Sequence, residues 1–438
     1  MAIGTTVDGT LPAQPDLRRV ILAATIGNVL EWFDFLVYGF FAVTIAQVFF
    51  PASDPTVSLL ITFGAFALSY LARPLGALLI GSYTDRAGRK AGLTLSIGLM
   101  MIGTALMVVT PGYATIGIAA PIIITIARVL QGFSVGGEFG SAVTFLVEHA
   151  GERKGFSASW QWSTTGMVSV IVSLFGLALT TLLTHEQLVD WGWRVPYVFG
   201  LLVGPAGLYI RSRITETADF LAAEKPREMP PGMPIADLLR RHPVSLLLAL
   251  GASIVSNASY YLLLYIPTYG VKTLHLPAYT GFAATLLGGI LLAVFSVVAG
   301  YWSDRITSRP RIMLMAGWLF VLAAYPCFWL MDHYPSLATA MFAVGLLNLI
   351  KAGYSGVLPS VMSEQFPVET RAVGVAFSYS LSVTIFGGFA PFVATWLIAH
   401  TGDPLSPAYY LMVTALLSII ALIAIQRRTP AFAATEKR

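Results

Sequence analysis

Six ionisable residues interrupt long apolar stretches of the sequence, and their types indicate what chemistry the chain can do. Three are acids and three are bases: Glu31, Asp34, Glu138, Arg73, Arg128 and Lys351. A charge in an apolar environment is costly, so each of these residues is expected to have a partner or a function. Carboxylates can take up and release protons, whereas arginine and lysine can bind anions. The equal numbers of acids and bases suggest pairing.

Asp34 and Arg128 can lie at similar depths if their stretches are helical. Asp34 falls roughly 21 Å from the start of its stretch, and Arg128 lies deep in a longer stretch that is expected to tilt. A carboxylate takes up a proton when a neighbouring arginine moves away and releases it when the arginine returns. We interpret these two residues as a candidate proton-coupling pair. The alternative is a permanent salt bridge that only joins two helices.

The other four ionisable residues allow several arrangements. Arg73 and Glu138 lie at matching depth, and we interpret them as a structural ion pair, with Glu138 also a possible second proton carrier. Glu31 lies three residues before Asp34 and is a further candidate for proton coupling. Two interpretations of Lys351 stay open. It binds a carboxylate group of a ligand, or it pairs with Glu31 or Asp34.

Polar and aromatic side chains are also present in the apolar stretches. Each one alone is more often a helix-packing residue than a ligand. As a group they are typical of a hydrogen-bonding cavity, to which Lys351 and Arg128 would add positive charge. Besides Trp162, Thr164 and Tyr260, the candidate binding residues are Asn28, Gln131, Gln161, Asn257, Tyr261, Tyr265 and Tyr379.

The composition identifies the elements that must position these residues. Of 438 residues, 56% are hydrophobic and only 11% are charged, and the mean hydropathy is +0.75. An average soluble domain carries about 25% charged residues. This excludes a soluble globular enzyme, a disordered chain and a fibrous chain, and it predicts an all-α polytopic membrane protein.

Several site chemistries are also excluded. The single cysteine, Cys327, excludes a disulfide within the chain and a CxxC metal site. We find no Walker loop, HExxH or nucleophile-elbow motif, so we expect no enzymatic activity, no metal, no cofactor and no nucleic-acid partner.

Twelve stretches are long enough to span a bilayer, which needs about 20 apolar residues. Most of the 26 lysine and arginine residues fall in the even-numbered loops and the termini, so both termini are predicted to be cytoplasmic. We expect a tail (1–19), a six-helix half (20–213), a proline-rich cytoplasmic linker (214–243), a second half (244–426) and a tail (427–438), with a short surface helix at 235–241. The predicted spans are 20–50, 57–82, 92–110, 117–148, 156–184, 194–213, 244–271, 278–303, 311–331, 336–362, 371–399 and 407–426.

A loop motif occurs twice, 219 residues apart, which is half of the chain length. The first copy covers residues 81–90 and the second covers 300–309. Such a recurrence indicates two six-helix halves in parallel repeat, with a binding site near the bilayer midplane. We interpret the loops as a cytoplasmic latch between the halves, although simple positive anchors are the alternative. Because Thr307 and Ser308 replace a glycine and an arginine, we expect the second copy to contribute less. The latch residues are Gly81, Asp85, Arg86, Gly88, Arg89, Asp304 and Arg305.

At these residues the chain resembles the major facilitator superfamily, and more narrowly its metabolite–proton symporter family. The stretches that carry the resemblance are 27–35, 73–76, 128–138, 191–196 and 385–391. The resemblance implies a plasma-membrane, multi-pass carrier (in the bacterial inner membrane) that works by alternating access. It also implies that Asp34 and Arg128 match the superfamily's proton-linked pair. Residues 111–117, 159–161 and 266–270 look most like the citrate/tricarballylate branch.

The resemblance therefore implies proton-coupled uptake of a small di- or tricarboxylate by a monomer, with protons and the lipid bilayer as its other partners. The fifth span lacks the Gly-Pro pair typical of antiporters, which favours symport or uniport over antiport. The alternatives are uptake of α-ketoglutarate, shikimate or a betaine-like zwitterion, and a solute sensor that does not transport. A quaternary ammonium needs an acidic or aromatic cage, so Lys351 favours an anion.

Overall fold

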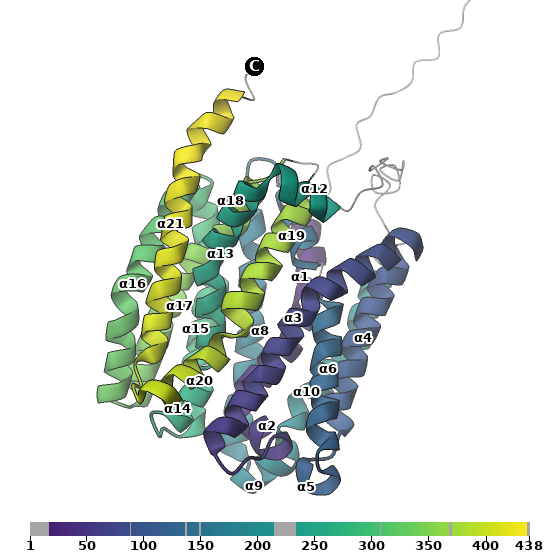
Figure 1. The fold of residues 1–438 in the computed structure, drawn as a ribbon, viewed down its shortest axis with the longest axis vertical. Coiled ribbons are helices and arrows are strands. Elements are labelled where there is room, and N and C mark those ends of the chain that lie inside the picture. The colour runs from purple at the N-terminus through teal and green to yellow at the C-terminus, as the bar shows by residue number, and fades with distance from the viewer. Residues whose placement is uncertain are drawn as a thin grey trace, which may run out of the picture.

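The computed structural model describes residues 17–87, 89–135, 138–148, 150–213, 234–306, 308–367 and 370–435. Helices and short connecting loops account for these described ranges, and no strand occurs within them. The helices run roughly side by side as one bundle (Figure 1). This confirms the all-α class that the composition predicted.

The N-terminal half (17–213) forms one side of the bundle in Figure 1. The short α5 and α9 and the π-helical turn η1 lie in its connecting loops. Its helices are α1 (Leu17–Phe40), α2 (Ala42–Phe49), α3 (Pro55–Ala87), α4 (Arg89–Val109), α5 (Tyr113–Ile116), α6 (Ala119–Ser134), α7 (Glu138–Glu148), α8 (Lys154–Leu182), α9 (His185–Gln187), η1 (Leu188–Gly192) and α10 (Arg194–Arg213).

The C-terminal half (234–435) forms the other side. It begins with α12, which covers the stretch where a short surface helix was expected, whereas most of the predicted linker and both chain ends lie outside the described residues. Its helices are α12 (Pro234–Arg241), α13 (Pro243–Leu264), α14 (Ile266–Lys272), α15 (Ala278–Ser303), α16 (Arg309–His333), α17 (Leu337–Ser355), α18 (Leu358–Ser363), α19 (Arg371–Ser382), η2 (Val383–Gly388), α20 (Ala390–Thr401) and α21 (Ser406–Thr435).

Every predicted span contains helix, but not all of these helices are long and apolar enough to cross a bilayer alone. Among the described residues, eight helices pass that test, and nine do if the bent pair Trp32–Phe40 and Ala42–Phe49 counts as one span. Two shorter apolar helices cover Thr94–Val109 and Ala119–Ser134. The count of twelve spans therefore stays a prediction.

Several spans are broken where the sequence places proline. Pro267, Pro359 and Pro391 each lie in the first turn of a helix that continues a span after an interruption. Proline cannot donate a backbone hydrogen bond, so a helix tends to stop before it and restart. The break between α1 and α2 has no proline and bends the chain by 73°. In membrane carriers, broken helices are tolerated where they line a cavity.

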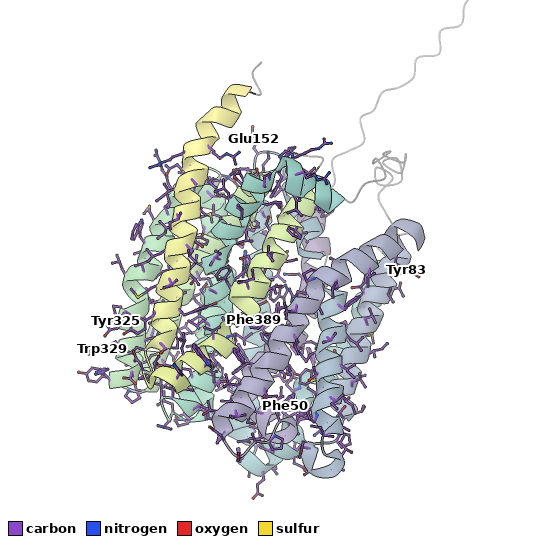
Figure 2. The ribbon with its side chains drawn as sticks, viewed as in Figure 1. Phe50, Tyr83, Glu152, Tyr325, Trp329 and Phe389 are labelled. Carbon is purple, nitrogen blue, oxygen red and sulfur yellow. The ribbon has the colours of Figure 1, made fainter. Side chains whose placement is uncertain are left out.

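The two halves meet along α8 and α15, and the helix backbones approach closely there. A side chain at Gly155 would collide with the backbone of Gly300, and one at Gly300 would collide with that of Gly155. At the same end of the bundle lie α12 and Glu152, whereas Phe50 lies at the opposite end (Figure 2). The charge distribution predicts that the Glu152 end is cytoplasmic.

Candidate functional site

A cluster of aromatic rings lies between the halves in the interior of the bundle. Trp32 packs edge-on against Tyr260 with ring centroids 5.5 Å apart, and Trp162 packs against Tyr260 at 5.9 Å. Tyr261 extends the cluster toward Tyr70 at 5.1 Å. These residues come from α1, α3, α8 and α13, so the cluster joins both halves of the chain.

Lys351 lies against this cluster and is completely buried on α17. Its Nζ donates to the Ser256 carbonyl oxygen at 2.7 Å and to Ser355 Oγ at 3.4 Å. The same atom lies 4.2 Å from the ring centroid of Trp162 and 5.2 Å from that of Tyr260. No carboxylate among the described side chains pairs with Lys351. The ammonium group is thus held by neutral oxygens and ring faces.

Asp34 has other partners, so it does not supply the counter-ion that one interpretation of Lys351 required. The Thr104 hydroxyl donates to Asp34 Oδ2, and Gln131 Nε2 donates to the same oxygen at 3.3 Å. Gln131 Nε2 also lies 3.1 Å from Thr104 Oγ1. The side chain of Glu31, the other acid proposed for Lys351, lies outside the described residues.

Gln131 bridges Asp34 to Arg128. The Arg128 Nη1 group donates to Gln131 Oε1 at 2.6 Å, and its Nη2 group lies 3.4 Å from Ser69 Oγ. The structure records no direct ion pair between the two described side chains of Asp34 and Arg128. Depth along the spans put Asp34 and Arg128 at a similar level, and Gln131, which was predicted to be a substrate ligand, lies between them.

Ring faces also surround both arginines of the N-terminal half. The Arg128 guanidinium lies 4.6 Å from the Phe35 ring and 4.4 Å from the Tyr38 ring. The Arg73 guanidinium lies 4.7 Å from the Phe35 ring and 4.2 Å from the Tyr70 ring. Phe35 thus lies close to both cations. The proposed Arg73–Glu138 pair stays a prediction, because the Glu138 side chain lies outside the described residues.

Two of the remaining predicted residues bond to each other. Asn28 Nδ2 donates to the backbone carbonyl oxygen of Gln161 at 3.2 Å, and Gln161 Nε2 donates to Asn28 Oδ1 at 2.8 Å. Both side chains are buried, so this reciprocal pair joins α1 to α8. These two hydrogen bonds fix α1 against α8, the helix that carries Trp162.

The predicted residues of the C-terminal half are spread along α13 and α19. Asn257 Nδ2 donates to Ser382 Oγ at 3.2 Å, which joins these two helices. Tyr265 packs against Phe63 with centroids 5.6 Å apart. Tyr379 is buried on α19.

Two buried donors beside Lys351 have no acceptor in the described part of the chain. They are the indole Nε1 of Trp162 and the hydroxyl of Tyr260. Buried polar groups are nearly always hydrogen-bonded, so such exceptions need an explanation. A ligand with carboxylate oxygens would satisfy both donors and the ammonium group together. The sequence had named both residues among the polar and aromatic candidates, whereas it missed Ser355, which could have been found because it lies one helical turn after Lys351.

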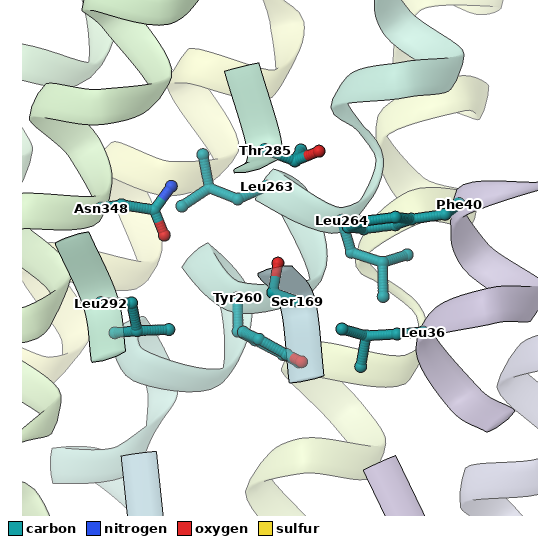
Figure 3. A pocket seen from close by; sticks show the side chains of 9 residues that line it. All are labelled: Leu36, Phe40, Ser169, Tyr260, Leu263, Leu264, Thr285, Leu292 and Asn348. Atoms are coloured by element: carbon teal, nitrogen blue, oxygen red, sulfur yellow. The ribbon is translucent and has the colours of Figure 1, made fainter. Parts of the chain in front are cut away.

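The cavity next to these groups is small in this structure. It measures about 20 Å³, room for about one water molecule, and leucine side chains and Tyr260 form much of its wall (Figure 3). Asn348, one turn before Lys351 on α17, also lines it. A small organic ligand needs several times this volume. In this arrangement of the halves, the cavity beside Tyr260 therefore has no room for such a ligand.

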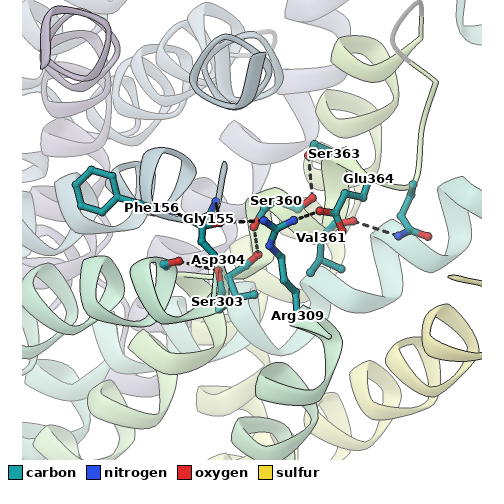
Figure 4. A network of polar contacts seen from close by, with 12 residues as sticks. Gly155, Phe156, Ser303, Asp304, Arg309, Ser360, Val361, Ser363 and Glu364 are labelled. Carbon is teal, nitrogen blue, oxygen red and sulfur yellow. Dashed lines mark hydrogen bonds and ion pairs between the residues drawn. The ribbon is translucent and has the colours of Figure 1, made fainter. Parts of the chain in front are cut away.

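At the end of the bundle that is predicted to be cytoplasmic, Asp304 joins the halves directly. Its two carboxylate oxygens accept hydrogen bonds from the backbone N–H groups of Gly155 and Phe156, at 2.7 and 2.9 Å (Figure 4). These groups lie in the first turn of α8, where a negative charge is favoured. Arg309 pairs with Asp304 at 2.9 Å and also with Glu364. Arg309, the last residue of the second motif copy, thus supplies a cation next to the position where Ser308 replaces an arginine.

The other latch residues lie in different surroundings. Arg305 contacts the ring and hydroxyl of Tyr301 and forms no ion pair with the N-terminal half among the described residues. An ion pair also joins the two halves, between Arg371 and Glu148 at 3.7 Å. The latch role of the first copy stays a prediction, because the side chains of Gly81, Asp85, Arg86, Gly88 and Arg89 lie outside the described residues.

Comparisons with known proteins place this geometry in a wider context. A family model described as "sugar (and other) transporter" matches residues 20–230 and 213–428. The citrate-proton symporter of Klebsiella pneumoniae is 36% identical over 93% of this chain and 92% of its own length. The proline/betaine transporter of Salmonella typhimurium is also 36% identical, over 96% of this chain and 86% of its own length.

Solved structures show the same fold. A partially occluded, inward-open structure of the xylose transporter from E. coli matches with a TM-score of 0.71 at 16% identity, and covers 94% of this chain and 98% of its own. At this identity the likeness concerns the fold alone.

We predict that Asp304→Asn weakens the closed cytoplasmic end. The change removes the charge that accepts two backbone hydrogen bonds, and hydrogen bonds to charged groups are worth about 1.5–3 kcal/mol each. Spin labels on Glu152→Cys and Arg427→Cys, in a Cys327→Ser background, report the separation of the halves. The distance distribution should shift toward longer values.

Arg305→Gln is the matched control, because Arg305 is adjacent to Asp304 but contacts only Tyr301 in this region. Its distance distribution should stay as in the parent protein. If Asp304→Asn and Arg305→Gln give the same distribution, Asp304 is not a latch.

Proposed function

Because the chain belongs to the sugar (and other) transporter family of the major facilitator superfamily, we propose that it is a proton-coupled symporter that takes up a small carboxylate. We further propose twelve membrane spans in two six-helix halves with both termini in the cytoplasm. The carrier is a multi-pass protein of the plasma membrane. It works as a monomer by alternating access.

The relatives leave the substrate open, because a citrate-proton symporter and a proline/betaine transporter are equally identical to this chain. The surroundings of Lys351 support the carboxylate. A betaine-type substrate brings its own cation and needs ring faces to bind it. In this site the ring faces of Trp162 and Tyr260 already lie against Lys351, and the ring face of Tyr70 lies against Arg73. An additional cation beside them would be repelled.

The donors around Lys351 support the same choice. The free N–H of Trp162 and the O–H of Tyr260 require acceptors, and a quaternary ammonium has none. A carboxylate offers two oxygens, which accept several hydrogen bonds and neutralise the ammonium group. We therefore propose a di- or tricarboxylate such as citrate or tricarballylate, with one carboxylate bound by Lys351.

Proton coupling is assigned to Asp34 and its partners. In this arrangement of the halves, Gln131 connects the carboxylate of Asp34 to the guanidinium of Arg128. Because these residues lie on α1 and α6, a small movement between the two helices can break the bridge. Asp34 then takes up a proton from the outside, and restoring the bridge favours its release inside. Glu31 and Glu138 remain the next candidates.

We predict that Asp34→Asn reduces the accumulation of citrate driven by a pH gradient in proteoliposomes at least about tenfold, because an amide cannot carry the proton. Exchange of internal for external citrate should remain measurable, because exchange needs no net proton movement. Asp190→Asn, at an exposed loop position, is the control and should leave both activities unchanged. If Asp34→Asn still accumulates citrate against its gradient, another group carries the proton.

Lys351→Met tests the binding role of the ammonium. Methionine keeps similar volume without charge, and we expect citrate binding to weaken by about 1.5–3 kcal/mol, or roughly 10- to 150-fold. Lys351→Arg should partly restore binding and change the order of preference among carboxylates, because a planar fork suits different geometries. The measurement is competition binding to the purified, detergent-solubilised carrier.

The exposed Lys272→Met is the matched control, and its affinity should equal that of the parent protein. Because methionine removes a buried charge, the unfolding temperature of Lys351→Met should not fall. If Lys351→Met binds citrate as tightly as the parent protein and still transports it, Lys351 does not bind the substrate and has only a packing role.

A further inference from the structure

We propose that the indole ring of Trp162 is the partner of the Lys351 charge in the empty carrier, and that a substrate carboxylate displaces it in the loaded carrier. Trp162 would thus be the residue that allows the unloaded protein to pass through its closed state. The inference rests on the proposed function and assigns a role within the same site.

A symporter has to return empty after it releases its substrate. During that return, Lys351 passes through a closed state without the substrate's negative charge. A cation in the dry interior without compensation raises the energy of that state and slows the return. In this structure the site has no room for a substrate, because the cavity beside Tyr260 measures only about 20 Å³.

The compensation for the charge comes from both halves of the protein. Ser256, Ser355 and Tyr260 lie in the C-terminal half together with Lys351, so these contacts can persist when the halves separate. Trp162 lies on α8 in the N-terminal half, and its ring centroid lies 4.2 Å from Nζ. This contact can form only when the halves close. A desolvated contact of this kind is among the stronger cation–π interactions.

The ring also has a use when substrate is present. The indole Nε1 has no acceptor in the described residues, although it is buried. A carboxylate that enters between Lys351 and Trp162 would remove the ring face from the ammonium and accept a hydrogen bond from the ring edge. In the empty carrier the face of the Trp162 ring contacts the Lys351 ammonium, and in the loaded carrier its N–H group donates a hydrogen bond to the substrate carboxylate.

The position of the ring on the helix is stabilised by neighbouring contacts. Trp162 is only 1% exposed and packs against Tyr260. The residue before it, Gln161, is bonded to Asn28. Trp160, one residue further back, packs against Phe156 instead and does not contact Lys351 in the described residues. Trp160 thus provides a matched control on the same helix.

The test compares two transport modes in proteoliposomes with labelled citrate at saturating concentration. Exchange of citrate for citrate needs only the loaded carrier, whereas net uptake driven by a pH gradient also needs the empty carrier to return. For Trp162→Leu we expect the ratio of net uptake to exchange to fall at least tenfold, while the loss of the N–H donor also weakens citrate binding. Trp162→Phe keeps a ring face, so its net uptake should lie between that of the parent protein and that of Trp162→Leu.

A double variant separates this role from simple packing. In Trp162→Leu combined with Lys351→Met there is no charge to compensate, so the ratio of net uptake to exchange should return toward the parent value. Trp160→Leu should leave the ratio unchanged. The purified variants are compared for unfolding temperature, so that a fall in both rates through misfolding is recognised.

Two results would overturn the inference while the proposed function stands. One is a parent-like ratio of net uptake to exchange in Trp162→Leu. The other is an equal loss of both rates that the double variant does not relieve. Failure of the parent protein itself to exchange citrate or another di- or tricarboxylate would instead contradict the proposed function.

Discussion

A buried ammonium group held by neutral partners is the feature on which the rest of this site depends. Lys351 is fully enclosed, and in the described structure its charge faces two serine oxygens and two aromatic rings rather than a carboxylate. Such a charge raises the energy of a closed membrane protein unless something compensates for it. The rings provide a modest compensation, and an anionic substrate would provide a larger one. This difference favours a carrier that closes more readily with substrate than without it.

The cytoplasmic contacts and the central site belong to the same movement. Asp304 accepts hydrogen bonds from the first turn of α8, and Trp162 lies on the same helix in contact with Lys351. A movement of α8 relative to α15 therefore changes both the latch and the environment of the buried charge. In the N-terminal half, the bridge from Asp34 through Gln131 to Arg128 connects α1 to α6. We infer that proton and substrate sites communicate through these helix contacts and need no direct bond between Asp34 and Lys351.

Much of this arrangement could be predicted from the sequence, because buried charges in apolar stretches are rare. Depth along the spans put Asp34 and Arg128 at a similar level, and hydrophobic length indicated the helical class, whereas the interruptions at Pro267, Pro359 and Pro391 were not predicted. The Gln131 bridge was not predictable, because depth alone cannot show which polar neighbour comes between two ions. The role of Arg309 was missed because the second motif copy was judged by its substitutions at 307 and 308, whereas its last residue pairs with Asp304 in space. The ring partner of Lys351 depends on how two distant helices cross.

The most direct test of the central claim is uptake by the parent protein in proteoliposomes, with and without an inward proton gradient. Labelled citrate, tricarballylate, α-ketoglutarate, shikimate, proline and glycine betaine are compared at equal concentration. The account predicts that one or more di- or tricarboxylates accumulate only when the proton gradient is present, and that proline and betaine neither accumulate nor compete. Accumulation of betaine or proline without any carboxylate uptake would contradict it.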